Sequence, residues 1–226
     1  TTNWQDSADH DIGDDVPFKL TAKIASNFDD YTTYKFVFHD EQSAGLTFKP
    51  DTVKVTVAGN ELKASDYTVV TDPDDDCTFH VVINDLKKIS GAAANAEVAV
   101  EYKSTLNEHA VIGSAGNPNE AYLGYSNNPH NSNDTTTTPK DKVTVFTFKV
   151  VANKINGADD KALKGAAFAL YKKGQDSAWK LVGLNNATEA NGKYTIVDPD
   201  KTTFDWVGLD DGEYKIEEII TPAGFN

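Results

Sequence analysis

The chain has 226 residues, with 35 acidic side chains, 21 lysines and a net charge of −14. It contains no arginine, and an acidic chain without arginine is a poor candidate for binding nucleic acid or phosphate-rich ligands. No run approaches the ~18 consecutive apolar residues of a membrane span. We therefore expect neither a nucleic-acid partner nor membrane insertion, and the length allows one large or two ordinary domains.

The chain has no methionine and one cysteine, Cys77. It starts at Thr1 and stops at Asn226 without a signal peptide, an anchor or a sorting tail, so we interpret it as a piece of a longer protein. A single cysteine excludes an internal disulfide framework and a four-cysteine zinc site. We expect Cys77 to be a small strand residue and the domains to be stabilised in some other way.

In the first half, alternation of apolar and polar residues predicts strands at 34–38, 53–57, 78–83 and 97–102. Turn-forming residues separate these strands. The segment 85–94 has the composition of one short helix. The acidic run 72–76 offers carboxylates of the kind that bind Ca²⁺, but a solvated acidic turn is the preferred interpretation. No metal site is predicted.

In the second half, further strands are predicted at 143–154, 166–172, 179–182, 193–197, 203–206 and 213–220. Between the halves, residues 127–139 are polar and end with proline, as linkers do. The charge also divides there, with a net −13 over residues 1–139 and −1 over residues 140–226. These patterns predict an all-β protein with two tandem immunoglobulin-like β-sandwich domains, 1–139 and 140–226.

The usual motifs of enzymes are absent from the sequence. The five histidines form no His-Glu-x-x-His pair, and there is no Gly-x-Ser-x-Gly, phosphate-binding loop or dinucleotide fingerprint. The chain is therefore not expected to be a turnover enzyme, and no cofactor is implied.

A specific pattern occurs near the end of the chain. Side chains alternate along a strand, so Tyr214, Ile216 and Glu218 share one face and a carboxylate is buried beside two apolar groups. Within 148–154 the same alternation places Lys154 at the end of an apolar row. Burial favours the neutral forms of both groups, which gives a nucleophilic amine and a carboxylic acid that can donate a proton.

Three features together resemble the B-type repeat of the collagen adhesin, as used in sortase-assembled Gram-positive pilins. They are Lys154, the strand Leu-Lys-Gly-Ala-Ala-Phe-Ala-Leu at 163–170, and Tyr-x-Ile-x-Glu-x-x-x-Pro-x-Gly-Phe at 214–225. In that family a lysine attacks an asparagine carboxamide on the last strand, a buried glutamate moves the protons, and an isopeptide bond forms with loss of ammonia. The resemblance implies that Lys154 is the donor, with Lys149 a weaker candidate because it points to the opposite face. It implies that Glu218 is the proton shuttle.

In this family the acceptor follows the Pro-x-Gly-aromatic turn. Asn226 comes directly after Phe225 and looks too early for that position. The acceptor of the second domain is therefore expected beyond Asn226.

The first half resembles the other isopeptide-forming domain of backbone pilins. The resemblance rests on Ile-Gly-Asp-Asp-Val-Pro-Phe at 12–18, the segments 34–40 and 45–48, and Gly-Asn-Pro-Asn leading to Tyr-Ser-Asn-Asn-Pro within 116–129. It implies an asparagine acceptor on the last strand, for which Asn127 is preferred over Asn128.

Asp40 continues the apolar row of residues 34, 36 and 38 in phase, so it is the expected catalytic carboxylate of the first domain, with Glu101 as the alternative. The donor lysine of such domains precedes the Gly-Asp segment. Lys19 and Lys23 follow that segment, so the donor is expected upstream of Thr1.

The resemblance implies a structural subunit of a covalently polymerised pilus shaft, located in an extracellular, cell-wall-anchored pilus. Its partners would be other pilin subunits joined by a sortase, and the whole pilus would contact host surface ligands. The alternative is an adhesin or minor pilin stalk that binds host matrix or glycan. The short polar loops favour the shaft.

Overall fold

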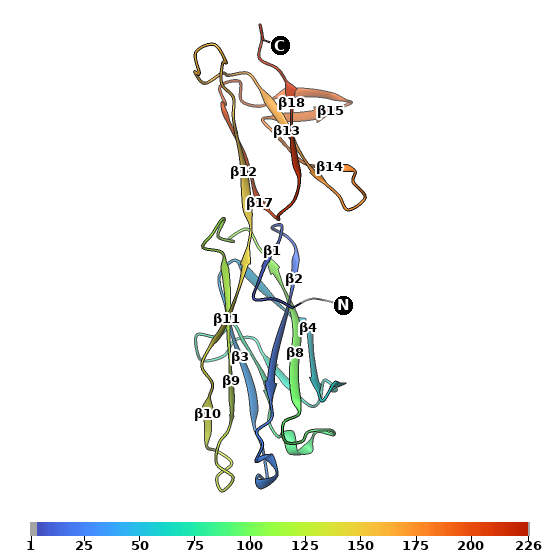
Figure 1. Cartoon of the computed structure of the whole chain (residues 1–226), viewed down its shortest axis with the longest axis vertical. Coiled ribbons are helices and arrows are strands. Elements are labelled where there is room, and N and C mark those ends of the chain that lie inside the picture. Colours follow the sequence, from blue (N-terminus) through green and yellow to red (C-terminus); the bar gives the residue numbers. More distant parts are fainter. Residues whose placement is uncertain (1–3, 226) are drawn as a thin grey trace. The chain divides into compact units, whose positions relative to one another are not determined.

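The computed structural model in Figure 1 describes residues 4–225, and the chain divides into two compact units, Thr1–Phe146 and Thr147–Asn226. The division lies later than the boundary expected at 139–140. The reason is that the strand β11 (Asp141–Phe146), which follows the expected linker, pairs with β9 (Asn117–Ser126) and so belongs to the first unit.

The first unit contains two sheets. The first sheet has the order β1-β11-β9-β3-β7-β6, with β10 pairing β9. Besides β9 and β11, its strands are β1 (Ser7–Asp9), β3 (Phe36–Gln42), β6 (Thr68–Val70), β7 (Phe79–Ile83) and β10 (Thr135–Thr137). The second sheet has the order β2-β8-β4-β5, with strands β2 (Asp15–Lys23), β4 (Leu46–Val57), β5 (Asn60–Glu61) and β8 (Glu97–Leu106).

The core of the first unit lies between these sheets because apolar residues alternate along each strand. In β7, for example, Phe79, Val81 and Ile83 are buried, whereas the residues between them are partly exposed. The ring of Phe79 stacks on that of Phe48 with a centroid separation of 3.7 Å. This core also encloses a group of buried polar side chains.

The helical elements within residues 4–225 are two short 3-10 helices, η1 (Phe28–Asp30) and η2 (Leu86–Lys88). The helix expected at 85–94 is therefore reduced to η2. Asp85 precedes it, and the Asp85 carboxylate accepts a hydrogen bond from the backbone N–H of Lys87, a contact that favours a short turn. Among the described residues, no helix has the length and apolar character needed to cross a membrane.

The second unit has smaller sheets. The strand β12 (Phe148–Asn153) pairs with β17 (Thr203–Leu209), and β13 (Ala167–Lys173) lies between β14 (Trp179–Asn185) and β18 (Tyr214–Ile220). The hairpin β15–β16 (Ala187–Ala190, Lys193–Ile196) completes it. The single strand expected at 143–154 is thus two strands, β11 and β12, that belong to different units, with Thr147 between them.

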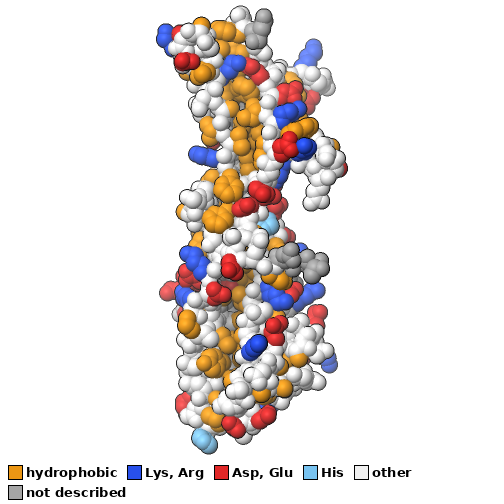
Figure 2. Space-filling view, viewed as in Figure 1, with side chains coloured by type: hydrophobic (Ala, Val, Ile, Leu, Met, Phe, Trp, Pro, Cys, Tyr) orange, Lys and Arg blue, Asp and Glu red, His pale blue; other side chains and the backbone are white. Residues whose placement is uncertain are grey.

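The core of the second unit is small. It consists of Ala166, Phe168, Leu170, Phe204, Trp206 and Leu209. Several large apolar side chains of this unit remain at its surface, and apolar groups are visible over its strands in Figure 2. Those at least 40% exposed are Val151, Leu181, Val182, Tyr194, Val197, Val207 and Ile216, together with Ile155 and Phe225. Ile216 was expected to be buried and is 40% exposed.

The prediction of an all-β protein with two sandwich domains is confirmed. Strands occupy most of both units, and each unit has its own apolar core, which is extensive in the first and small in the second.

Candidate functional sites

A buried polar centre lies in the core of the first unit. It brings together Asp40 of β3, Tyr102 of β8 and Asn119 of β9, with exposed fractions of 0%, 2% and 2%. The Tyr102 hydroxyl donates to Asp40 Oδ2 at 2.7 Å. The Asn119 amide donates to the same oxygen at 3.1 Å and to the Tyr102 hydroxyl oxygen at 2.7 Å. The three side chains therefore contact one another directly.

Strand register explains how these residues meet. Asp40 lies opposite Ala121 in the β3–β9 pairing, and Asn119 is two residues from Ala121, so it points to the same face. Tyr102 reaches Asp40 from the second sheet, across the sandwich. Asp40 also continues the buried row of Phe36 and Phe38, as its phase in the sequence indicated.

Burial determines the electrostatics of the centre. It raises the pKa of Asp40 to about 7, although the hydrogen bonds from Tyr102 and Asn119 oppose this rise. Burial also raises the pKa of the Tyr102 hydroxyl, and the nearby Asp40 carboxylate adds to that effect. Asp40 Oδ1 and Asn119 Oδ1 are buried and have no hydrogen-bond partner among the described residues. A carboxyl group with this pKa can hold or release a proton near neutral pH.

Asn119 differs from the other buried asparagine of β9, Asn117. The Asn117 side chain accepts from the Val111 N–H at 2.8 Å and donates to the carbonyls of Val111 and Val145 at 3.2 Å. It is therefore fully used in holding loop and strand backbone together. The Asn119 carboxamide instead contacts a carboxyl group and a hydroxyl group, and its oxygen is unpaired.

The sequence-based acceptor candidates lie elsewhere. Asn127 is exposed and follows the end of β9, and its backbone N–H donates to the carbonyl of Asp134. The Asn128 amide donates to the Asp134 carboxylate at 2.7 Å. Both thus belong to the turn that follows β9, and the preferred candidate Asn127 is not part of the polar centre. Phase along the strand could not separate the candidates, because Asn119 and Asn127 each lie an even number of residues from the apolar residue Leu123.

Glu101, the alternative carboxylate, faces out of the sandwich. It is adjacent to Tyr102 on β8, and neighbouring strand residues point to opposite faces. Its carboxylate pairs with the Lys19 ammonium at 3.2 Å. Glu101 is therefore outside the polar centre, whose carboxyl group is that of Asp40.

A groove of about 720 Å³ reaches one residue of the polar centre, Asn119. It is lined by residues of β1, β2, β3, β9 and β11, and Asn119 is one of them. Among the described strands, β2 pairs with β8 alone, so its other edge is open beside the groove. The apolar side chains Phe18, Leu20 and Phe36 contribute to the lining.

The second unit contains a different pair. Lys154 follows β12, and its ammonium donates to Glu218 Oε2 of β18 at 2.9 Å. Both side chains are partly buried, with exposed fractions of 22% and 27%. Glu218 Oε1 is buried and has no hydrogen-bond partner among the described residues. The structure thus brings the proposed donor and the proposed proton shuttle together.

Register and alternation explain this pair. Glu218 lies opposite Phe168 in the β13–β18 pairing, beside the apolar core. Lys154 is partly buried, whereas Lys149 is exposed and lies opposite Val207, so Lys149 is the weaker donor candidate, as alternation implied. Asn226 lies outside the described residues.

Two family descriptions match the chain. Residues 12–129 match "Gram-positive pilin backbone subunit 2, Cna-B-like domain", which is more than half of the chain. The chain belongs to this family. Residues 148–226 match the SpaA "Prealbumin-like fold domain". The two matches fall within the two compact units.

Individual relatives agree with this assignment. The chain is 25% identical over 230 residues to the trypsin-resistant surface T6 protein of Streptococcus pyogenes serotype M6, covering 95% of this chain and 40% of that protein. It spans less than half of the T6 protein. The structure of the T6 backbone pilin matches with a TM-score of 0.68 and 21% identity, covering 96% of this chain and 46% of the other.

A second solved structure matches over most of its own length. Domains D2 and D3 of the major pilin SpaD from Corynebacterium diphtheriae give a TM-score of 0.65 at 23% identity. The match covers 97% of this chain and 82% of that one. At this level of identity the likeness shows the shared fold of two consecutive domains.

Proposed function

We propose that the chain is part of a structural subunit of an extracellular pilus shaft and that each unit is built to be closed by an intramolecular isopeptide bond. Membership of the pilin backbone family supports the first statement. The observation that carries the second is the contact of a buried carboxyl group with an asparagine carboxamide at Asp40 and Asn119.

In the first unit, the proposed acceptor is Asn119 and the donor is a lysine on a segment that precedes Thr1. The neutral lysine amine attacks the Asn119 carboxamide carbon, and the protonated Asp40 carboxyl group polarises its oxygen after the carboxamide rotates. Asp40 then moves a proton from the amine to the departing nitrogen. A C–N bond forms, the original C–N bond breaks, and one ammonia leaves with no net gain or loss of electrons.

The groove supports this assignment because it connects Asn119 with the open edge of β2. A lysine-bearing strand added to that edge would place apolar side chains against Phe18 and Leu20. Its lysine side chain would approach Asn119 without crossing the packed core. Desolvation in the filled groove would favour the neutral, nucleophilic amine.

In the second unit, Lys154 is the proposed donor and Glu218 the proposed proton shuttle. Their contact at 2.9 Å allows direct proton transfer between the amine and the carboxylate. The proposed acceptor is an asparagine on a strand that follows Asn226. When that strand packs beside Glu218, it would cover part of the apolar surface that this unit exposes.

Such bonds suit a protein that bears tension. Each bond would join strands at the two ends of a domain, so that pulling on the chain loads a covalent link rather than strand hydrogen bonds. A cross-link also restricts the unfolded chain, by analogy with disulfides, and needs no oxidising environment. Joining of subunits by a sortase completes the proposal, with other pilin subunits as partners.

Intact-mass measurement on the longer parent protein tests the cross-links. The protein should be lighter than its sequence by one ammonia for each closed bond. Asn119→Ala and Asp40→Ala should each abolish one loss, and Lys154→Ala and Glu218→Ala should abolish another. Asn127→Ala is the matched control and should leave both losses unchanged. An unmodified mass for the parent protein would overturn the cross-link proposal.

A second measurement distinguishes a subunit of the pilus shaft from the stalk of an adhesin or minor pilin. In the native bacterium, deletion of the gene should remove the ladder of covalent polymers seen when cell-wall extracts are run on a denaturing gel. If the ladder persists and binding to host matrix is lost instead, the adhesin or minor pilin alternative is correct. The two tests are independent, because a shaft subunit can polymerise whether or not its internal bonds form.

A further inference from the structure

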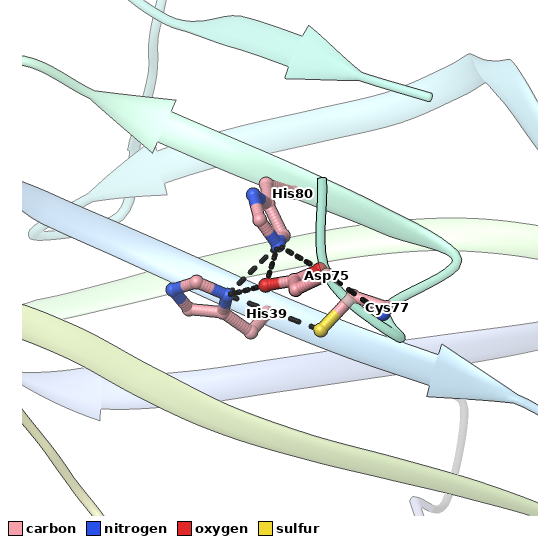
Figure 3. Close-up of side chains that lie close together, drawn as sticks. All are labelled: His39, Asp75, Cys77 and His80. Carbon is pink, nitrogen blue, oxygen red and sulfur yellow. Dashed lines mark hydrogen bonds and ion pairs between the residues drawn. The ribbon is translucent and has the colours of Figure 1, made fainter. Parts of the chain in front are cut away.

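Four potential metal ligands converge on the first unit, apart from the polar centre. They are His39 of β3, His80 of β7, and Asp75 and Cys77 of the loop that joins β6 to β7 (Figure 3). Their ligand atoms all lie within 4.8 Å of one another. Figure 3 shows the two imidazoles, the carboxylate and the thiol pointing toward one common position.

The spacing of these atoms suits a tetrahedral ion. His80 Nε2 lies 3.0 Å from Asp75 Oδ2, His39 Nδ1 lies 3.5 Å from the same oxygen, and Cys77 Sγ lies 3.9 Å from His39 Nδ1. Zinc bonds of ~2.0–2.3 Å separate tetrahedral ligands by roughly 3.3–3.8 Å. His39 Nδ1 and His80 Nε2, 2.8 Å apart, need only a small movement outward.

The fold holds these side chains in place before any ion is present. His39 and His80 are directly opposite each other in the β3–β7 pairing, and their side chains are 17% and 15% exposed. The His39 ring stacks on Tyr122 with a centroid separation of 4.4 Å. Gly124 leaves space for this ring, because a Cβ there would lie 3.1 Å from His39 Nε2. The Asp75 carboxylate also accepts from the Cys77 backbone N–H.

The cluster lies on the outer face of the sheet. His39 and Asp40 are consecutive residues of β3, so their side chains point to opposite faces. Asp40 points into the core, and His39 points toward the loop between β6 and β7. The cluster is therefore separate from the cross-linking chemistry proposed for Asp40.

We propose that His39, Asp75, Cys77 and His80 form a Zn²⁺ site that fastens the loop between β6 and β7 to the outer face of the sheet. A borderline-soft ion that accepts nitrogen, sulfur and oxygen ligands in tetrahedral geometry suits this set, whereas Ca²⁺ and Mg²⁺ prefer oxygen ligands alone. With four protein ligands the site is closed, which is typical of a structural role rather than a catalytic one.

Charge in the loop adds to the attraction for a cation. Asp72, Asp74 and Asp76 accompany Asp75 in this loop, and no lysine lies between β6 and β7. A dication at the cluster would offset part of their mutual repulsion. The ion would stabilise the folded form because it binds the assembled ligands, which the unfolded chain holds far apart.

Titration of the reduced, metal-free chain with Co²⁺ alone and then with Zn²⁺ tests the site. The expected result is one Co²⁺ per chain, with the intense visible absorption of a tetrahedral complex and a thiolate-to-metal charge-transfer band. Zn²⁺ should displace the Co²⁺ and raise the melting temperature of the first unit. Absence of binding, or a weak octahedral spectrum without the charge-transfer band, would overturn the proposal.

Variants locate the ion. Cys77→Ser should remove the charge-transfer band, and His80→Ala should weaken Zn²⁺ binding by at least about tenfold, since even outer-shell partners of ligands contribute that much. His130→Ala, at an exposed histidine in the turn after β9, is the matched control and should bind like the original chain. Loss of binding in His130→Ala but not in His80→Ala would place the ion elsewhere and refute the assignment.

Discussion

The two units each place a carboxyl group in contact with a nitrogen-bearing side chain, a carboxamide in the first unit and an amine in the second. In the first unit Asp40 contacts a potential acceptor, Asn119, and both side chains are buried. In the second unit Glu218 contacts a potential donor, Lys154, and both side chains are about a quarter exposed. Among the described residues, Asn119 hydrogen-bonds to no lysine side chain and Lys154 to no asparagine side chain.

The difference in burial follows from the size of the sheets. Asp40 lies between two broad sheets, with Tyr102 reaching it from the opposite layer. Glu218 lies on β18, at the edge of a three-stranded sheet beside a small core. The comparison teaches that the broad sandwich buries its carboxyl group completely and raises the pKa of Asp40 to about 7, whereas the small sheet leaves Glu218 partly exposed in an ion pair with Lys154.

The largest expected effect concerns the two cores. Phe204→Ala in the second unit and Phe79→Ala in the first should each cost about 3–5 kcal/mol, because both rings are fully buried. Phe204→Ala is expected to unfold the smaller second unit. Phe79→Ala is expected to destabilise the first unit, which keeps a cooperative unfolding transition. Calorimetry should show one remaining transition for Phe204→Ala and a shifted first-unit transition for Phe79→Ala.

Val197→Ala is the control for this comparison, because Val197 is 64% exposed and its truncation should change stability by less than about 0.5 kcal/mol. If Phe204→Ala leaves the second transition unchanged, the ring is not part of a cooperative core. The difference in burial between Asp40 and Glu218 would then not follow from the sizes of the two cores.

An intermediate effect is expected from the ionisation of Asp40. Its pKa in the folded chain is about 7, above the ordinary value of 3.8, so the folded form retains a proton that the unfolded chain releases. The free energy of unfolding of the first unit should therefore decrease as pH rises from about 4 to about 7. The Asp40 contribution to this decrease is roughly 2–4 kcal/mol.

Denaturant unfolding at pH 4.5 to 8 checks this dependence, with Asp40→Asn as the matched variant that cannot ionise. The difference in stability between the original chain and Asp40→Asn should shift in favour of the variant as pH rises. If the free energy of unfolding depends on pH in the same way for the two proteins, burial does not raise the pKa of Asp40.

The smallest effect is expected from the Lys154–Glu218 pair. A double-mutant cycle with Lys154→Ala and Glu218→Ala should give a coupling energy of about 0.5–1 kcal/mol in the chain without the cross-link, since water screens a partly exposed pair. The matched pair Lys19–Glu101 has a longer contact of 3.2 Å and a half-exposed carboxylate, and should give less. A coupling energy of several kcal/mol would show that Glu218 is shielded from water as completely as Asp40.

Much of the candidate chemistry was predictable from strand phase. Asp40 continues an apolar row, and Lys154 and Glu218 lie at alternating positions beside apolar residues, so each was a candidate for a core-facing group. The motif around residues 214–225 added the pairing of Lys154 with Glu218. These features are local, and local periodicity survives in the fold.

Other features depend on pairing between distant strands. The choice of Asn119 over Asn127 follows from the register of β9 against β3, which a sequence does not display. Tyr102 joins the centre only because the second sheet packs across it. The cluster of His39, Asp75, Cys77 and His80 likewise needs the β3–β7 pairing to bring residue 39 beside residues 75–80.

The sequence by itself determined the all-β class, the presence of two domains and the family resemblance, because alternation and short motifs are properties of neighbouring residues. The tertiary structure decided where one domain ends, which asparagine meets Asp40, and that four separated ligands converge. Each of these depends on which strands lie side by side, and packing of the whole unit selects that arrangement.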